Sequence, residues 1–243
     1  MNQIFLSGEY ITEHFFECDQ ATYHHLFSVH RTRVGEILAI VTEKWRFTVK
    51  IKKNEKTKIF YELIEKVAVK EKLPVYTLFQ SLPKQDKMGT IIDYAVQLGI
   101  TDIFPIVTNR TVVKWDDKKA LKNLERWQAK AESAANQAKQ DKIPRINKVL
   151  SLKDCLTQLD LSGFDELIVF WEEVATNRHL FDQIKNKNVR KIGFLIGPEG
   201  GLDKSEIEML EKMNFKVLSL GDSVLRVEIA ATVALSQLKL LYT

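Results

Sequence analysis

The stretch Ile192-Gly193-Phe194-Leu195-Ile196-Gly197-Pro198-Glu199-Gly200-Gly201-Leu202-Asp203 runs from an apolar segment through a turn rich in glycine to the expected start of a helix. A short apolar run bounded by turn residues is typical of a buried strand. Asp203 and Glu206 have the spacing of a helix-capping box. Glycines at the carboxyl end of such a strand can adopt positive φ and let the backbone approach a ligand closely. The stretch predicts an α/β fold in which this loop is either a ligand-binding turn or a structural corner.

A second strand with the same kind of ending lies downstream. The segment Val217-Leu218-Ser219-Leu220-Gly221 is apolar and ends in glycine, and a helix is expected from about residue 224 to 241. Two neighbouring strands that end in glycine turns predict one pocket between their ends. The first loop matches neither the dinucleotide pattern G-x-G-x-x-G nor the P-loop pattern ending in G-K-[ST]. A phosphate cradle is therefore not predicted.

The sequence pattern changes near residue 71, which predicts two domains. Residues 1–71 alternate apolar and polar positions in short runs, such as 36–41 and 47–51, and indicate a small β-rich domain. In residues 72–243 expected strands at 75–80, 103–107 and 167–171 alternate with expected helices at about 86–98 and 118–138. This alternation predicts a largely parallel sheet with helices on both faces.

The two glycine loops belong to a longer ordered set of segments. The set comprises Gln80-Ser81-Leu82-Pro83-Lys84, Leu98-Gly99, Pro105-Ile106-Val107-Thr108, Gly197-Pro198-Glu199-Gly200-Gly201, Leu220-Gly221, and Leu225-Arg226 with Glu228 and Ala230. Near the start, His25-Leu26, Val29, Arg31 and Gly35 extend it over nearly the whole chain. In order and spacing, the set resembles the RsmE family of the SPOUT superfamily. Members of this family are bacterial methyltransferases that act on uridine N3 of small-subunit ribosomal RNA.

The resemblance implies a fold, a cofactor and an assembly. The expected fold is a SPOUT-type, mostly parallel α/β sheet with a carboxyl-terminal trefoil knot, preceded by a small PUA-like β-barrel domain of an RNA-binding type. The cofactor is S-adenosyl-L-methionine, and the assembly is a homodimer that buries the last helix. The cofactor-binding residues that the resemblance implies are Ile196, Gly197, Glu199, Gly200, Leu220, Gly221 and Leu225.

Arg226 is the candidate catalytic residue. Methylation of uridine N3 requires an exposed pairing edge, so the target uridine must be unpaired or flipped out. Loss of the N3 proton leaves negative charge on the ring, and a guanidinium group stays protonated while offering forked donors to that charge. Glu199 and Glu228 are the nearest carboxylates in the motifs, and the general base is assigned to neither. On a regular helix Arg226 and Glu228, two positions apart, would point to different faces.

A lysine-rich segment in the first domain is a candidate RNA contact. Seven basic residues lie between positions 44 and 58, and Glu55 is the only acidic residue in this segment. Such density can contact a phosphate backbone, or it can form a solvated strand edge that discourages aggregation. The candidate RNA-binding residues are Arg31, Lys50, Lys52, Lys53, Arg110 and Lys114. The expected partner is 16S ribosomal RNA, either naked or in the assembled small ribosomal subunit.

Two positions depart from the family pattern and keep alternatives open. Val227 and Ile229 stand where the family usually has threonines, so a role of those hydroxyls in ligand contact is in doubt. A non-catalytic RNA-binding protein that retained the basic surface is one alternative, and a SPOUT methyltransferase acting on a different RNA is another. An α/β enzyme that uses a phosphorylated nucleotide is disfavoured, because the phosphate motifs are missing.

The cysteines, the histidines and the apolar runs indicate the cellular compartment and whether a metal or a membrane is expected. The two cysteines, Cys18 and Cys155, lie far apart without a pairing pattern and suit a reducing cytosol. The histidines show no metal-ligand spacing, so no metal is expected. No apolar run is long enough to span a bilayer, and the start lacks a secretory pattern. We therefore expect a cytoplasmic protein without a membrane partner.

Overall fold

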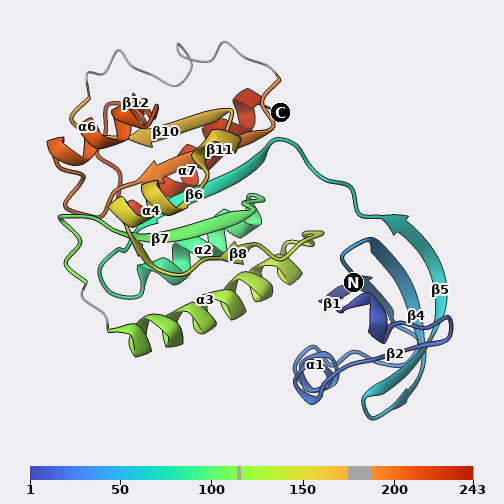
Figure 1. Cartoon of the computed structure of the whole chain (residues 1–243). Helices are drawn as coiled ribbons and strands as arrows, with labels where there is room; N and C mark the ends of the chain where they lie inside the picture. The colour runs from blue at the N-terminus through green and yellow to red at the C-terminus, as the bar shows by residue number, and fades with distance from the viewer. Residues whose placement is uncertain (114–115, 175–187, 243) are drawn as a thin grey trace. The chain divides into compact units, whose positions relative to one another are not determined.

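The chain forms two compact units in the computed structural model, which describes residues 1–113, 116–174 and 188–242 (Figure 1). One unit comprises Met1–Glu71 together with Ala135–Lys142. The other comprises Lys72–Ala134 and Ile143–Thr243. Each unit has its own sheet and its own hydrophobic core.

The second unit is built on a parallel sheet of seven strands. These are β6 (Val75–Ser81), β7 (Asp102–Val107), β8 (Arg145–Ile146), β9 (Leu150–Ser151), β10 (Glu166–Phe170), β11 (Lys191–Ile196) and β12 (Lys216–Leu218). Their order is β12-β10-β11-β6-β7-β8, with β9 also paired to β7, and every pairing is parallel. Most residues of the central strands β6, β10 and β11 are buried. The predicted parallel sheet is confirmed.

Helices cover both faces of this sheet. They are α2 (Lys87–Gln97), α3 (Asp117–Gln137), α4 (Leu152–Gln158), the short 3-10 helix η3 (Leu161–Gly163), α6 (Lys204–Lys212) and α7 (Val227–Tyr242). Side chains of α4 and α6 pack around Phe79 on one face. On the other face α7 contacts β6, β11 and α2. The expected fold class is confirmed, and the trefoil knot stays a prediction.

The strand before the second glycine loop ends earlier than the sequence predicted. The strand expected over 217–221 stops at Leu218, because the Ser219 hydroxyl accepts the Gly221 N–H (3.1 Å) and donates to the Gly221 carbonyl (3.0 Å). The helix expected from about residue 224 begins only at Val227. Residues 219–226 therefore form a loop at the carboxyl edge of the sheet.

A capping box fixes the start of α6, as the sequence predicted. Asp203 Oδ1 accepts the Glu206 N–H, and Glu206 Oε2 accepts the Asp203 N–H, both at 3.0 Å. Asn109, which follows β7, donates its side-chain amide to Asp203 and its backbone amide to Glu206. Hydrogen bonds from Ser205, Asn109 and the Glu206 amide lower the pKa of Asp203 to about 2.

We expect Asp203 to give the protein a pH-dependent part of its stability. Its folded pKa lies below its ordinary value of 3.8. The contribution is therefore fully present above that value and is lost as pH falls towards about 2. Asp203→Ala should lower the unfolding free energy at neutral pH by about 1 kcal/mol, the usual worth of an N-cap. Asp203→Asn keeps a capping oxygen without the charge, so its deficit in urea unfolding should shrink between pH 5 and pH 2. A deficit that is constant with pH would contradict this role.

The first unit is a curled five-stranded sheet. Its strands are β1 (Asn2–Phe5), β2 (Phe15–Glu17), β3 (Ile37–Val41), β4 (Trp45–Glu55) and β5 (Lys58–Ala68), in the order β1-β3-β4-β5-β2. The pair β1 and β3 is parallel and the other pairs are antiparallel. The unit also contains a short helix, α1 (Gln20–His24), the 3-10 turn η1 (Gly8–Tyr10) and the π-helical turn η2 (His25–Val29). This sheet agrees with the expected small PUA-like domain.

Residues 135–142 are tied to the strands of the first unit by polar contacts. The Gln3 side chain donates to the Gln140 carbonyl (2.8 Å), and Arg46 forms an ion pair with Asp141 (2.8 Å). Lys139 donates to the Met1 carbonyl (2.6 Å). A segment distant in sequence therefore completes this unit.

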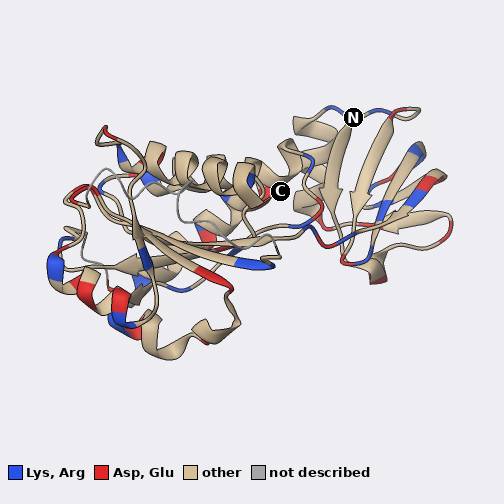
Figure 2. Ribbon diagram, turned by 90° about the horizontal axis from the view of Figure 1, so that it is seen from above, with Lys and Arg blue, Asp and Glu red and all other residues tan. Residues whose placement is uncertain are grey.

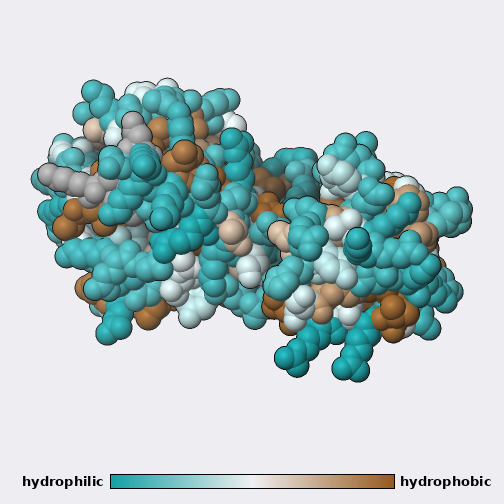
Figure 3. Space-filling model, turned by 90° about the horizontal axis from the view of Figure 1, so that it is seen from below, coloured by the Kyte–Doolittle hydropathy of each residue, from teal (hydrophilic) through white to brown (hydrophobic). Residues whose placement is uncertain are grey.

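The surface is mostly hydrophilic on the face shown in Figure 3, where hydrophobic side chains form small separate patches. Among the helices of the described residues, none is long and apolar enough to cross a membrane. The same part of the chain holds no group of three histidine, cysteine or carboxylate side chains arranged to bind a metal ion.

Candidate functional site

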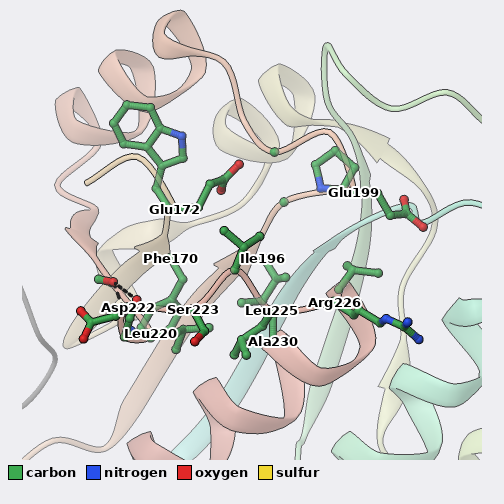
Figure 4. A pocket seen from close by; sticks show the side chains of 18 of the residues that line it. Phe170, Glu172, Ile196, Glu199, Leu220, Asp222, Ser223, Leu225, Arg226 and Ala230 are labelled. Atoms are coloured by element: carbon green, nitrogen blue, oxygen red, sulfur yellow. Dashed lines mark hydrogen bonds between the residues drawn. The ribbon is translucent and has the colours of Figure 1, made fainter. Parts of the chain in front are cut away.

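A cavity of about 350 Å³ lies at the carboxyl ends of β10, β11 and β12. Its walls come from the ends of these three strands, the two glycine loops, α2 and the start of α7 (Figure 4). The size is within the usual range for small-molecule sites. The prediction that the two glycine loops face one pocket is confirmed.

The cavity has apolar walls and an acidic rim. Phe170, Ile196, Leu225 and Ala230 are among the lining residues, and Figure 4 shows Ile196, Leu225 and Ala230 close together at its centre. The carboxylates of Glu172, Glu199 and Asp222 also line it. Apolar walls suit a flat aromatic group, and carboxylates favour a cationic ligand while they repel phosphate.

Two glycines of the site have backbone conformations that other residues rarely adopt. Gly201 has φ of +69° and Gly221 has φ of +126°. A Cβ at Gly201 would lie 1.9 Å from Glu172 Oε1, so this glycine allows the Glu172 carboxylate to reach the loop. Gly197 and Gly200 do not have positive φ. A Cβ at Gly197 would lie 3.2 Å from Leu202 Cγ.

Four charged side chains form a cluster at one side of the cavity. Lys87 Nζ lies 2.9 Å from Glu199 Oε1 and 3.7 Å from Glu228 Oε2. Both carboxylate oxygens of Glu199 also accept the Lys84 N–H at 3.0 Å. Figure 4 shows Arg226 and Glu199 on the same side of the cavity, away from Asp222. We call Lys87, Glu199, Arg226 and Glu228 the charge cluster.

Hydrogen bonding favours the ionised forms of two members of the charge cluster, Glu199 and Lys87. Burial raises the pKa of Glu199, but the bonds from Lys87 and the Lys84 amide outweigh it, so the net pKa is lowered. The hydrogen bond to Glu199 raises the pKa of Lys87, against burial and the charge of Arg226. Neither group suits a base that must change protonation near neutral pH.

Comparison with known proteins identifies the family. A family model for an RNA methyltransferase domain matches residues 70–239. The ribosomal RNA small subunit methyltransferase E of Bacillus subtilis is 33% identical over 219 residues, which cover 88% of this chain and 85% of that protein. The chain belongs to the ribosomal RNA small subunit methyltransferase E (RsmE) family. The Rickettsia conorii member is 31% identical and covers 85% of this chain and 77% of its own length.

A solved structure of the RsmE family has the same fold. The Neisseria gonorrhoeae ribosomal RNA small subunit methyltransferase E, bound to S-adenosyl methionine, matches with a TM-score of 0.83 and 25% identity. The match covers 100% of this chain and 98% of that one. The α/β sheet and the first-unit sheet are therefore the architecture of this family.

Most of the cofactor-binding residues expected for an RsmE member line one cavity. These are Ile196, Gly197, Glu199, Leu220, Gly221 and Leu225, together with the candidate catalytic Arg226. Gly200 is not among the lining residues, and its carbonyl accepts a hydrogen bond from Arg110 (3.0 Å). Val227 lines the cavity, whereas the side chain of Ile229 is exposed. Thus only the first of the two substituted positions borders the site.

Sequence reasoning missed the wall that β10 contributes and the role of Lys87. Phe170 ends β10, Trp171 and Glu172 follow it, and all three line the cavity without any glycine signal. Because β10 lies between β11 and β12, its carboxyl end has to border a pocket formed by the other two. Lys87 lies far from both glycine loops in sequence, and only the fold brings it to Glu199.

The expected RNA-binding residues lie in different parts of the chain. Arg31, with φ of +52°, follows η2 and is exposed, and Lys50, Lys52 and Lys53 are exposed on β4. Glu62 on β5 forms an ion pair with Lys52 and is the cross-strand partner of Lys50, and Lys53 pairs with Glu55. Figure 2 shows acidic and basic positions mixed on these strands. The carboxylates beside these lysines therefore make the net positive charge of this surface smaller than the sequence of the segment suggests.

The remaining two RNA-binding candidates belong to the second unit. Arg110 follows β7 and contacts the loop after β11 through the Gly200 carbonyl. Lys114 lies outside the described residues. Arg110 is thus the candidate that borders the cavity loops of this RsmE member.

We expect Gly201→Ala to weaken cofactor binding. The loss of affinity should exceed the loss that destabilisation of the fold alone would cause. A residue with a Cβ at positive φ costs about 1 kcal/mol or more, and the Cβ would also displace the Glu172 carboxylate from the rim. Affinity for S-adenosylmethionine, measured by calorimetry, should fall about fivefold, the worth of one partly exposed charge contact. Gly35→Ala is the matched control, because Gly35 has φ of +94° and open space around its Cβ. Equal affinities of the two variants would contradict this role of Gly201.

Proposed function

We propose that this chain transfers the methyl group of S-adenosyl-L-methionine to N3 of a uridine in small-subunit (16S) ribosomal RNA. Membership of the RsmE family supports the reaction. The observation that carries the proposal is the cavity at the carboxyl edge, with Arg226 at its side and glycine loops on its walls. The alternatives are methylation of a different RNA and RNA binding without catalysis.

The residues of the cavity fit S-adenosylmethionine. Apolar side chains of Ile196, Leu220 and Leu225 would cover the faces of the adenine, while backbone groups of the glycine loops bond its edge. The rim carboxylates of Glu172 and Asp222 suit the cationic amino and sulfonium groups. When bound, the cofactor supplies an activated methyl group, which leaves positioning as the main task of the protein.

Arg226 would act on the target base. Its guanidinium lies beside the cavity and remains charged at neutral pH, so it can donate hydrogen bonds to a uracil oxygen as negative charge develops on the ring. The base has to enter with its pairing edge exposed. The general base stays unassigned, because the donors that lower the pKa of Glu199 also make its carboxylate a weaker proton acceptor.

A homodimer that buries α7 is part of the proposal. Leu240 and Ile229 of α7 are 74% and 46% exposed, and Val224, just before the helix, is 84% exposed. Large apolar side chains exposed on one helix favour a protein interface. Light scattering that gives the mass of a single chain at micromolar concentration would contradict the dimer.

The RNA contacts are proposed at Arg31, Lys50, Lys52, Lys53, Arg110 and Lys114. In the first unit the contacts compete with ion pairs to Glu62 and Glu55, so their contribution depends on exchanging a carboxylate for a phosphate.

Because the proposed substrate is ribosomal RNA, a cytoplasmic location is part of the proposal.

The deciding experiment is transfer of labelled methyl to small ribosomal subunits and to naked 16S RNA that both lack native uridine-N3 methylation. Label at uridine N3 supports the proposal, and the better substrate of the two identifies the form that is recognised. Binding of S-adenosylhomocysteine without transfer to either would favour a different RNA. Loss of both binding and transfer would favour the non-catalytic alternative.

A further inference from the structure

The charge of Arg226 acts on Lys87, whose ammonium group contacts the carboxylates of Glu199 and Glu228, and Arg226 pairs with neither carboxylate. Within the described ranges of the chain, its side chain makes no hydrogen bond or ion pair, although its charge acts on Lys87. Arginine next to carboxylates normally forms forked pairs with them. Something in the charge cluster therefore keeps this guanidinium available.

Lys87 is the cation that contacts both carboxylates of the charge cluster. Its ammonium group bonds Glu199 at 2.9 Å and lies 3.7 Å from Glu228. Glu199 is further satisfied by the Lys84 amide. Glu228 Oε2 is buried and has no hydrogen bond, so Lys87 is its compensating charge. A buried carboxylate oxygen that lost this cation would attract the next one.

We propose that Lys87 is a positioning residue that holds Arg226 free for the substrate by neutralising Glu228 and Glu199. The inference rests on the proposed function of Arg226. Lys87 stands at the first position of α2, and Glu228 lies in the first turn of α7. Because α2 and α7 pack together, the ammonium group is held between the two helices and the loop after β11. Without Lys87, Arg226 pairs with Glu228 and is no longer available to bind the target uracil.

A purely structural role for Lys87 makes a different prediction. In that case Lys87 only ties the loop after β6 to Glu199, and its loss disturbs the loop and the cavity together. Cofactor affinity would then fall along with the rate. The positioning role instead predicts a lower rate with unchanged cofactor affinity.

The test compares Lys87→Met, Lys87→Arg and the double variant Lys87→Met/Glu228→Gln. Lys130→Met is the matched control, because Lys130 pairs with Asp93 at 2.8 Å between α3 and α2. One readout is the rate at which phenylglyoxal modifies Arg226, followed by peptide mass spectrometry. This readout reports the free guanidinium whether or not the protein methylates RNA. The second readout is kcat for RNA methylation, with the Kd for S-adenosylhomocysteine measured in parallel.

In the positioning role, Lys87→Met slows modification of Arg226 about fivefold, as one new ion pair would. The double variant restores the modification rate, because Glu228→Gln removes the competing charge. Lys87→Met also lowers kcat with unchanged Kd, and Lys87→Arg recovers it. Unchanged modification in Lys87→Met, or no recovery in the double variant, overturns the inference. If modification of Arg226 follows this pattern but the wild-type chain transfers no methyl group, the proposed function fails. The inference that Lys87 keeps Arg226 unpaired is then still supported.

Discussion

Arg226→Ala is expected to lower the rate of RNA methylation by about 10²–10³-fold, the usual cost of removing a preorganised donor to developing charge. Cofactor affinity should stay nearly unchanged, because the cavity walls come mainly from other residues. Arg226→Lys should recover little, since an ammonium group lacks the forked geometry of a guanidinium. Single-turnover methylation of 16S RNA, together with calorimetry of S-adenosylhomocysteine, measures the two quantities separately.

Arg190→Ala is the control for this experiment. Arg190 is also exposed, but it precedes β11 at the amino edge of the sheet, opposite to the cavity. Its removal should leave the rate unchanged. If Arg226→Ala methylates RNA at the wild-type rate, Arg226 is not the catalytic residue. If it loses cofactor affinity in the same proportion as rate, Arg226 acts in cofactor binding.

Local sequence signals predicted most of the fold and much of the cavity. The apolar runs before Gly197 and Gly221 predicted two strands whose carboxyl ends lie at the same edge, since the strands of a parallel sheet end at one edge. The capping box at Asp203 fixed the start of α6. These features depend on residues a few positions apart, which is why sequence alone reveals them.

The charge cluster could not be predicted, because its members come from distant segments. The expectation that Arg226 lies within the last helix was wrong: α7 begins at Val227, so the spacing of a regular helix does not relate Arg226 to Glu228. Both charges act on Lys87. In the same way, Glu62 is ten or more positions from Lys50 and Lys52 in sequence but faces them across the strands β4 and β5.

Gly197→Val is expected to weaken cofactor binding between about tenfold and a hundredfold, in the range of overpacking costs. A Cβ at this position would already lie 3.2 Å from Leu202 Cγ and 3.5 Å from the backbone of Gly201. Leu202 is buried and has little room to move. The two methyl groups of valine therefore either enter the cavity or displace the loop that forms its wall. Calorimetry with S-adenosylmethionine measures the loss.

Gly163→Val separates this effect from the general cost of valine at a glycine position. Gly163 lies in η3, and a Cβ there would meet nothing within 4 Å. The control should bind the cofactor like the wild type. Thermal unfolding without ligand shows whether Gly197→Val still folds. A folded Gly197→Val protein with wild-type affinity would mean that the cofactor does not approach this loop. The Ile196–Gly201 wall would then be a structural corner, the other possibility that the sequence left open.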